Sequence, residues 1–494
     1  MIQRLLVANR GEIACRILRA CREADIETVA IFAPDDANSL FTEMADITVA
    51  LDGETIGETY LDIEQILSVA RHFKVDAIHP GYGFLSERSE FAEAVMNAGI
   101  IWVGPSVEAI DLMGDKMTAR KTMKNAGVPV IPGEEIEGGI DVIVEASQRV
   151  GFPLLLKASA GGGGKGMRAV HSEDQIHSAA QSAQREALKA FGDDRIYVER
   201  LLAGSRHIEI QILADQHGST IHLGERECSV QRRHQKVFEE SPSIAVNDNL
   251  REAMGQAAIN AAKAVDYVGA GTVEFLLSAN GEFFFLEMNT RIQVEHPVTE
   301  MVTGVDLVRE QIRIAQGQRM SIKTCQMRGH AIEVRLYAED PKNNFLPAIG
   351  KLLCFQPPEG PGIRLDTGFR EGDEVTPNYD PMLSKLIVWA PSREEALARM
   401  RCALEDFVVL GCVTNLTFLR ALCLHPDVIT GRTTTDMIET IWPDGWDEEI
   451  PSEMIELAYL ATYASHSMGA NRQLSTAIAS EIPTPFENLS GRFP

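Results

Sequence analysis

The segment from Glu287 to Glu295 combines carboxylates, amides and an arginine at alternate positions, a pattern suited to holding a cation beside an anion. If the segment is a β-strand, its side chains point alternately to two faces. One face then carries Glu287, Asn289, Arg291, Gln293 and Glu295, and the other carries Met288, Thr290, Ile292 and Val294. A solvated face would alternate similarly, but with more lysine, serine and threonine and less asparagine. The segment alone therefore leaves both interpretations open.

The preceding apolar strand favours a metal site. This strand, Thr272 to Leu276, is followed by Asn280-Gly281, a strong signal for a two-residue hairpin turn that leads into the Glu287 segment. With that turn Glu274 lies opposite Glu287, and opposed side chains are about 4.5–5.5 Å apart at Cβ. Two carboxylates so close repel each other unless a cation lies between them. With the amide oxygen of Asn289 they form an oxygen-rich set that suits Mg²⁺.

A glycine-rich loop follows the apolar strand that begins at Leu154. Its glycines are Gly161, Gly162, Gly163, Gly164 and Gly166. Backbone N–H groups in such a run can wrap phosphate oxygens, and the loop can close over a nucleotide. No Ser or Thr follows Lys165, so the loop is not a Walker A motif, and a plain mobile loop is the local alternative.

Two lysines near this loop are candidate phosphate contacts. Lys157 lies on the apolar strand, and a buried lysine needs an anionic partner, which a phosphate could provide. Lys116 follows Met113-Gly114-Asp115 and could be a second contact, although a surface lysine is the simpler interpretation of its spacing.

Two further polar segments have ambiguous roles. His207 to Ile212 alternates as a strand that places His207, Glu209 and Gln211 on one face, which is either a binding face or a solvated edge. Gln231 to Lys236 is a concentrated basic segment in an acidic chain, and either an anion site or a solvated patch would explain it.

Composition limits the classes of protein. The chain has 494 residues, enough for several domains, and a formal net charge of −25, which argues against a general nucleic-acid binder. It shows no secretory signal pattern and no uncharged apolar run of about 18 residues, so we expect no membrane span. The eight cysteines are scattered without a C-x-x-C pair, which favours reduced thiols in the cytoplasm or another reducing compartment.

The order of predicted elements defines four parts of the chain. Residues 1–113 alternate strands and helices, which predicts a doubly wound parallel sheet, with Asn9-Arg10-Gly11-Glu12 at the first strand-to-helix turn. That turn has no G-x-G-x-x-G fingerprint, so we predict no dinucleotide site. Residues 114–316 form a second unit with a subdomain at about 130–203. Residues 329–446 form a third unit, and 447–494 are a tail with one helical stretch, Ile455 to His466.

Taken in order, these motifs resemble the biotin carboxylase component of biotin-dependent carboxylases. The matching segments are Ala8-Asn9-Arg10-Gly11-Glu12-Ile13-Ala14, His79-Pro80-Gly81-Tyr82-Gly83-Phe84-Leu85-Ser86-Glu87, Met113-Gly114-Asp115-Lys116, Lys157-Ala158-Ser159 with its glycine run, Arg232-Arg233-His234-Gln235-Lys236 and Glu287 to Pro297. The resemblance implies an ATP-grasp fold, with an N-terminal parallel α/β domain, an ATP-grasp domain whose mobile lid is the subdomain above, and a C-terminal mixed α+β domain.

The resemblance also implies roles for individual residues. The ATP contacts would be Lys116, Lys157, His207, Gln231, His234 and the glycine loop, with Glu199, Leu202 and Leu276 around the adenine. The ligands of Mg²⁺, or Mn²⁺ in its place, would be Glu274, Glu287 and Asn289. The bicarbonate pocket would hold Lys236, Arg291, Gln293 and Val294. Glu295 would deprotonate bicarbonate, Arg335 would stabilise the biotin enolate, and Tyr82 would lie near biotin.

These implied roles make chemical sense. Bicarbonate becomes a good nucleophile only when it loses its proton, and a carboxylate such as Glu295 is a competent base if burial raises its pKa. Metal and lysines would offset the charge that builds on the transferred phosphoryl group, and the product would be carboxyphosphate. By pattern alone, Arg335 is better explained as an exposed or ion-paired strand residue, and only the resemblance favours the role at the enolate.

The resemblance predicts partners as well. No Met-Lys-Met occurs, so the biotin substrate would be attached to a separate carrier protein or domain, and a carboxyltransferase subunit would complete the reaction. Segments such as Leu336 to Pro341 most resemble the α chains of acyl-CoA carboxylases, and the tail resembles the start of their linker. The chain would then be a truncated α subunit or a stand-alone subunit, and the family is commonly dimeric. The alternatives are another ATP-grasp ligase that joins a carboxylate to an amine, and a non-catalytic nucleotide-binding regulatory subunit.

Overall fold

The computed structural model describes residues 1–136, 138–158, 167–192 and 194–447, and residues 1–446 form one compact unit. The predicted phosphate-loop glycines at 161–164 and 166, and the predicted tail helix Ile455 to His466, lie outside the described residues. Within the described part of the chain, no helix is long and apolar enough to cross a bilayer.

The N-terminal part is a five-stranded parallel sheet with strand order β3-β2-β1-β4-β5. Its strands are β1 (Arg4–Val7), β2 (Glu27–Phe32), β3 (Ile47–Ala50), β4 (Ala77–His79) and β5 (Ile101–Trp102), and its helical segments are α1 (Gly11–Glu23), η1 (Pro34–Asp36), α2 (Leu40–Met44), α3 (Ile63–His72), α4 (Ser89–Asn97) and α5 (Val107–Gly114). Leu5 and Val7 pack into one apolar cluster and Leu6 into another, because both faces of a parallel sheet are covered. The predicted doubly wound parallel sheet is confirmed.

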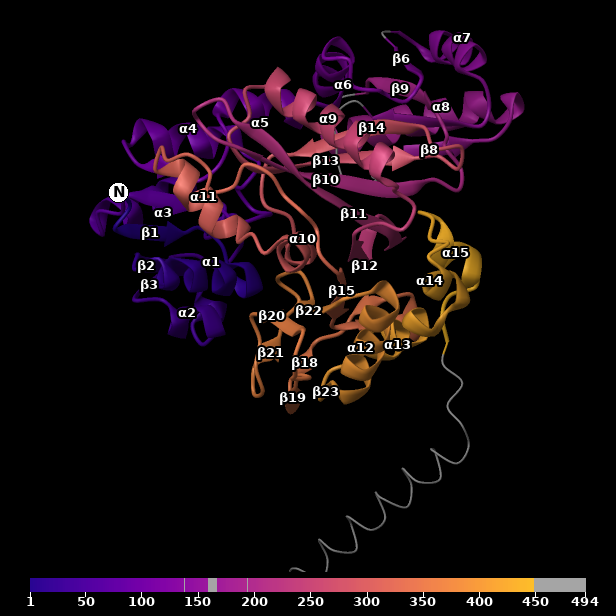
Figure 1. The fold of residues 1–494 in the computed structure, drawn as a ribbon. Coiled ribbons are helices and arrows are strands. Elements are labelled where there is room, and N and C mark those ends of the chain that lie inside the picture. The colour runs from indigo at the N-terminus through magenta and orange to yellow at the C-terminus, as the bar shows by residue number, and fades with distance from the viewer. Residues whose placement is uncertain (137, 159–166, 193, 448–494) are drawn as a thin grey trace, which may run out of the picture. The chain divides into compact units, whose positions relative to one another are not determined.

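Next along the chain comes a four-stranded antiparallel sheet with strand order β6-β9-β7-β8. It contains β6 (Gly133–Glu135), β7 (Leu154–Ala158), β8 (Met167–Val170) and β9 (Ile196–Arg200), and it is preceded by α6 (Lys116–Asn125) and accompanied by α7 (Ile140–Val150) and α8 (Glu173–Phe191). Figure 1 shows α7 and α8 beside these strands, and their apolar side chains share one buried cluster with β7 and β9. This sheet lies within the stretch predicted to be a subdomain.

The strands between Arg206 and Ala390 include eight that form one antiparallel sheet, in the order β14-β13-β10-β11-β12-β15-β22-β20. Its strands are β10 (Arg206–Ala214), β11 (Thr220–Arg232), β12 (Gln235–Ser241), β13 (Gly269–Leu277), β14 (Phe283–Asn289), β15 (His330–Tyr337), β20 (Ile363–Thr367) and β22 (Met382–Ala390). The helices α9 (Asp248–Ala264), α10 (His296–Thr303) and α11 (Leu307–Ala315) belong to the same region. Because β12 pairs with β15, one sheet joins strands from both sides of residues 317–328.

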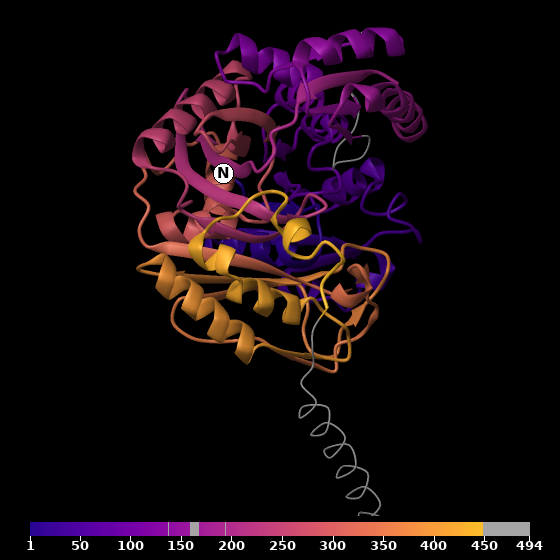
Figure 2. The same cartoon turned by 90° about the vertical axis from the view of Figure 1, so that its right-hand side faces the viewer.

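The C-terminal part combines short strands with helices, as expected for a mixed α+β domain. The strands are β16 (Glu339–Asp340), β17 (Leu346–Pro347), β18 (Gly350–Lys351), β19 (Cys354–Gln356), β21 (Glu374–Val375) and β23 (Val408–Leu410), and the helical segments are η2 (Pro341–Asn343), α12 (Arg393–Asp406), α13 (Leu416–Leu424), α14 (Pro426–Thr430) and α15 (Met437–Ile441). Figure 2 shows α12 and α13 beside this part of the large sheet, with which they share an apolar core.

Strand β10 lies in the interior of the large sheet, between β11 and β13. Its apolar residues, Ile208, Ile210 and Ile212, pack into a core with α9, and the opposite face carries buried His207, Glu209 and Gln211. Buried polar groups need hydrogen-bond partners, so this face must be a polar site. The solvated-edge interpretation of His207 to Ile212 is wrong.

The strand predicted from Glu287 to Glu295 ends early. β14 stops at Asn289, residues 290–294 are irregular, and Glu295 precedes the first residue of α10. The prediction of alternating faces for Arg291, Gln293 and Glu295 is therefore wrong. The physical reason is that side chains from other elements hold this segment in place of a neighbouring strand: Lys385 Nζ donates to the carbonyl of Val294 at 2.9 Å.

The hairpin before this segment has the predicted pairing but not the predicted turn. Near the turn Leu277 pairs with Phe283, and Ser278 N donates to Glu282 O at 2.8 Å, so the loop has three residues and not two. Gly281 takes a φ of +86°, which a glycine adopts without strain. A β-bulge between Glu274 and Phe275 then shifts the register by one residue, and Glu274 pairs with Glu287 as predicted.

Candidate active site

The predicted metal carboxylates face each other across the β13–β14 hairpin. Glu274 is 4% exposed and Asn289 is 6% exposed, and Asn289 Nδ2 donates to Glu274 Oε1 at 2.8 Å. Burial raises the pKa of Glu287, and the negative charge of Glu274 raises it further. This arrangement disfavours two negative charges unless a cation neutralises them, which is the electrostatic condition for a metal site.

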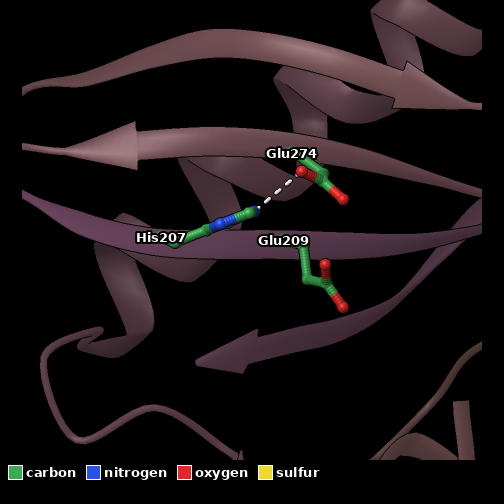
Figure 3. A group of neighbouring side chains, drawn as sticks. All are labelled: His207, Glu209 and Glu274. Carbon is green, nitrogen blue, oxygen red and sulfur yellow. Dashed lines mark ion pairs between the residues drawn. The ribbon is translucent and has the colours of Figure 1, made fainter. Parts of the chain in front are cut away.

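The oxygen donors fit Mg²⁺ better than a second group of buried side chains does. Glu274, Glu287 and Asn289 can offer only oxygen ligands, which hard cations prefer. Ligand atoms of His207, Glu209 and Glu274 also lie within 4.8 Å of one another, on neighbouring strands β10 and β13 (Figure 3). That second group shares Glu274 with the first but includes a nitrogen ligand, and its other carboxylate, Glu209, already contacts Lys236 and Arg226. The all-oxygen donors of the first group therefore suit a hard cation better than those of the second.

Lys236 is the centre of the charged network. Its Nζ lies 2.6 Å from Glu209 Oε2, 3.1 Å from Glu274 Oε1 and 2.5 Å from Glu295 Oε1. The lysine extends from β12, which follows β11 through a tight turn. One ammonium group thus joins a predicted metal ligand to the predicted base, two residues that are 21 positions apart in the chain.

Glu295 is 2% exposed, and cations surround its carboxylate. Besides Lys236, Arg335 Nη2 donates to its Oε2 at 2.8 Å. Burial alone would raise the pKa of Glu295, but the charges of Lys236, Arg335 and Arg226 hold it well below its usual range. The condition for a strong base, a raised pKa of Glu295, is therefore not met while these cations are in place. Glu295 is therefore ionised and only weakly basic while these cations contact it, and its pKa rises when one of them leaves.

Arg335 lies on β15 beside Glu295. It is 7% exposed, and its Nε donates to Glu239 Oε1 at 2.6 Å while Nη2 reaches Glu295. The interpretation of Arg335 as an exposed strand residue is therefore wrong, and its ion-paired state is confirmed. Both of its partners, Glu239 and Glu295, are buried, so these are not surface ion pairs.

The irregular segment 290–294 contains three predicted bicarbonate residues, Arg291, Gln293 and Val294, and each has different contacts. Arg291 contacts Glu87 Oε2 at 3.1 Å and donates to Asn289 Oδ1 at 2.9 Å. The amide of Gln293 donates to Glu274 Oε1 at 2.7 Å. Val294 contributes its backbone, whose carbonyl is held by Lys385. The structure thus brings Gln293, Lys236 and Glu295 together, with Arg291 beside the metal carboxylates.

The predicted nucleotide lysines lie near one another and near the carboxylates. Lys157 is 7% exposed and forms an ion pair with Glu199, which also accepts a hydrogen bond from Tyr197 Oη at 2.6 Å. The anionic partner required by buried Lys157 is therefore Glu199 in this structure. Lys116, the first residue of α6, has a pKa lowered by burial, and the charges of Glu287 and Lys157 also act on it. Half-buried Lys116 is thus not a plain surface lysine.

The basic segment from Gln231 to Lys236 is a hairpin turn. Arg233 and His234 both adopt positive φ, +48° and +68°, between β11 and β12. Such a turn normally has Asn or Gly, so two larger residues there mark local strain of the kind found at functional sites. Gln231 pairs directly with Lys236, and burial lowers the pKa of His234. Sequence patterns had shown only a basic patch.

The remaining predicted residues line the periphery. Leu276 pairs with His207 in the β10–β13 register, and His207 Nε2 lies 2.8 Å from Glu274 Oε2. Leu202 is half-buried just after β9. Tyr82 Oη donates to Glu12 Oε1, and burial raises the pKa of the Tyr82 phenol well above its usual value.

Several functional candidates received no individual role from the sequence. They are buried charged residues that contact the predicted ones: Glu12, Glu209, Arg226, Glu239 and Lys385. The signal in the sequence was charged residues within apolar strands, as in Ile208-Glu209-Ile210, because such residues are rarely buried without partners. Which partner each one finds depends on strand pairing, which the local pattern does not reveal.

Three protein-family models match most of residues 1–446. Residues 1–110 match the family described as biotin carboxylase, N-terminal domain. Residues 115–323 match the carbamoyl-phosphate synthase L chain, ATP binding domain, and residues 333–440 match the biotin carboxylase C-terminal domain.

Relatives and solved structures agree with these matches. The chain is 48% identical to biotin carboxylase 1 of Bacillus subtilis, over 89% of this chain and 99% of the relative. It is 45% identical to the propionyl-CoA carboxylase alpha chain of Ruegeria pomeroyi, over 96% of this chain and 73% of the relative. The structure of a biotin carboxylase complex with β,γ-ATP from Campylobacter jejuni is similar with a TM-score of 0.86 at 42% identity, covering 88% of this chain and 98% of the other. The biotin carboxylase domain of the Hydrogenobacter thermophilus 2-oxoglutarate carboxylase, in complex with MgADP, ADP and bicarbonate, gives a TM-score of 0.87 at 44% identity, covering 91% of this chain and 100% of the other.

Proposed function

The chain belongs to the biotin carboxylase family, and from that premise we propose that its buried charged network activates bicarbonate beside a metal-bound ATP. The protein is an ATP-dependent ligase that carboxylates the biotin of a carrier protein with bicarbonate, the first half-reaction of an acyl-CoA or related carboxylase. One observation carries the assignment of the site: Lys236 Nζ contacts Glu274, a proposed metal ligand, and Glu295, the proposed base, at the same time.

On the nucleotide side we assign ATP contacts to Lys116, Lys157, His207, Gln231 and His234. Glu199, Leu202 and Leu276 would surround the adenine, and the glycine loop at 161–166 would cover the phosphates. Mg²⁺, held by Glu274, Glu287 and Asn289, would neutralise phosphate charge when bound. The positive charges of Lys116 and Lys157 act on each other in the structure, which supports a common anionic ligand for the two.

On the bicarbonate side, Lys236, Arg291, Gln293 and the backbone of Val294 would hold the anion, and Glu295 would take its proton. A bicarbonate oxygen then attacks the γ-phosphorus and displaces ADP, and the carboxyphosphate that forms breaks down to CO₂ and phosphate in the pocket. Arg335 now bonds Glu295, and we propose that it turns to the ureido oxygen of biotin as negative charge develops there. That movement would remove one cation from Glu295 and raise its pKa. Tyr82 would border the biotin.

The two alternatives receive less support. A carboxylate–amine ligase of the same fold would not need Arg335 and Glu295 in contact, and a non-catalytic regulatory subunit would not need the full charged network. The comparisons favour neither.

The wider context of the protein is also a proposal. We infer domains at 1–113, 114–316, with a lid at about 130–203, and 329–446, followed by the tail 447–494. Partners would be a biotin carrier protein or domain, a carboxyltransferase subunit and a second copy of this chain. All eight cysteines are free thiols in the structure, which supports the cytoplasm or another reducing compartment.

ATP hydrolysis measured with and without bicarbonate and free biotin tests this function. We expect hydrolysis to require bicarbonate, and Glu295→Gln should bind MgATP in calorimetry while losing turnover, because an amide cannot accept the proton. Glu310→Gln is the matched control: Glu310 is 5% exposed on α11 and accepts only a backbone hydrogen bond from Ser321 among the described residues. Hydrolysis independent of bicarbonate would refute the site assignment, and full turnover in Glu295→Gln would refute the base.

A further inference from the structure

Arg226 hydrogen-bonds to side chains of the proposed bicarbonate site. Its five hydrogen bonds include none to the proposed base, Glu295, or to the proposed metal carboxylates, Glu274 and Glu287. It is on β11 and is fully buried, with 0% exposure. A guanidinium has five N–H donors and no acceptor, so burying it requires five accepting atoms. All five are present in the structure, and they come from four separate elements.

Five side-chain oxygen atoms accept the hydrogen bonds of Arg226. Nε donates to Glu209 Oε1, Nη1 donates to Gln211 Oε1 at 2.7 Å and Thr299 Oγ1 at 2.9 Å, and Nη2 donates to Thr272 Oγ1 at 3.0 Å and Gln293 Oε1 at 2.7 Å. They belong to β10, β13, α10 and the irregular segment that follows β14. One planar group therefore connects this segment to the sheet.

The contact with Gln293 determines the direction of an amide. Because Arg226 can only donate, it holds Oε1 of Gln293, and the NH₂ group of Gln293 must face the other way, where it donates to Glu274 at 2.7 Å. The reversed amide would set NH₂ against the guanidinium and oxygen against the carboxylate. Both contacts would be repulsive, so the orientation is set from both sides.

The contact with Glu209 acts on the other half of the site. Glu209 accepts from Arg226 through Oε1 and from Lys236 through Oε2, and Lys236 in turn contacts Glu295 at 2.5 Å. Arg226 thus contacts one proposed bicarbonate residue, Gln293, directly and reaches a second, Lys236, through Glu209.

We propose that Arg226 is a positioning residue for bicarbonate activation, acting through the amide of Gln293 and through Glu209 on Lys236. The proposal rests on the assignment of bicarbonate to this pocket. Donors that are already aimed at the anion stabilise charge without reorganising during the reaction, so a rigid support beneath them matters to the rate. A lysine cannot replace this support, because it has a point charge and three donors where the site presents five acceptors.

The test compares Arg226→Lys with a matched control. Arg393→Lys also replaces a largely buried arginine that bonds a carboxylate, Glu240 at 2.7 Å, and the carbonyls of Val428 and Ile429. We expect Arg226→Lys to lower kcat/KM for bicarbonate about 10- to 100-fold, as the loss of outer supporting contacts does elsewhere, with an unchanged KM for ATP. Arg393→Lys should lower the melting temperature without changing the bicarbonate kinetics.

A double-mutant cycle tests whether Arg226 acts through Gln293. If Arg226 acts through Gln293, then Arg226→Lys should cost less bicarbonate kcat/KM in a Gln293→Ala background than alone. Unchanged bicarbonate kinetics in Arg226→Lys, or equal losses for ATP and bicarbonate, would overturn the proposal. If Arg226→Lys does not fold, Glu209→Gln tests the same connection, with the same expected loss and the same contrary outcome. Bicarbonate-independent hydrolysis in the unmodified protein would instead overturn the proposed site itself.

Discussion

Lys385 offers a sharp test of how the buried charges stabilise this protein. The side chain is 0% exposed on β22, and its Nζ lies 3.1 Å from Glu12 Oε1, 3.8 Å from Asp366 Oδ2 and 2.9 Å from the carbonyl of Val294. Glu12 in turn accepts the hydroxyl of Tyr82. Replacing Lys385 by Met keeps most of the volume and removes the ammonium group.

The expected cost follows from these distances. At 3.1 Å and an effective dielectric constant of about 20, Coulomb's law gives about 5 kcal/mol of attraction between Lys385 and Glu12. Removing one partner of a buried pair leaves the other charge uncompensated, which typically costs about 3–5 kcal/mol. Asp366 retains Arg364 at 2.7 Å, so Glu12 is the carboxylate that loses most. We expect Lys385→Met to destabilise the fold by about 3–5 kcal/mol.

The assay is a double-mutant cycle of Lys385→Met and Glu12→Gln. Stability is followed by urea unfolding with one optical probe for all variants. Glu12→Gln removes the charge that Lys385→Met leaves unpaired, so the double variant should be more stable than Lys385→Met alone. Lys263→Met, an exposed lysine on α9, is the control and should leave stability unchanged.

Two results would refute this reasoning. A Lys385→Met protein as stable as the unmodified one would show that the pair contributes no net stability. A double variant as unstable as Lys385→Met would show that the loss comes from packing and not from the unpaired carboxylate. Turnover should also fall in Lys385→Met, because the carbonyl of Val294 loses its donor beside the proposed base.

Two further predictions concern the metal site and the N-terminal sheet. Glu287→Gln should raise the Mg²⁺ concentration needed for half-maximal ATP hydrolysis at least about tenfold, since even outer-shell partners change metal affinity about 10- to 100-fold; an unchanged Mg²⁺ requirement would remove Glu287 from the metal site. Burial lowers the pKa of His79 from 6.5 to about 4, so below pH 6.5 the unfolded chain binds a proton that the folded chain cannot, and stability falls as the pH falls. This residue should cost about 2 kcal/mol between pH 7 and pH 5, and the decrease should be smaller by that amount in His79→Gln unfolding curves; parallel pH profiles for the two proteins would contradict the prediction.

Local sequence patterns were sufficient for the parallel N-terminal sheet and for one cross-strand pair. The alternation of strands and helices over residues 1–113 predicts a doubly wound parallel sheet, and the structure confirms it with strands such as β1, whose side chains are buried on both faces. Glu274 opposite Glu287 was also predicted, although the three-residue turn and the β-bulge that produce this register were not. An Asn-Gly signal marks where a chain turns but not how many residues it uses.

The sequence by itself determined the family, the parallel N-terminal sheet and the residue types available for metal, nucleotide and bicarbonate. Only the tertiary structure decided what those residues do to one another. It ended the strand at Asn289, placed Lys236 among three carboxylates and lowered the pKa of Glu295 that burial alone would have raised. The physical reason is that electrostatic effects depend on distance and burial, so the state of a charged residue is set by partners such as Arg226 and Lys385. Those partners lie far away in the sequence, and only the pairing of strands in the folded sheet brings them into contact.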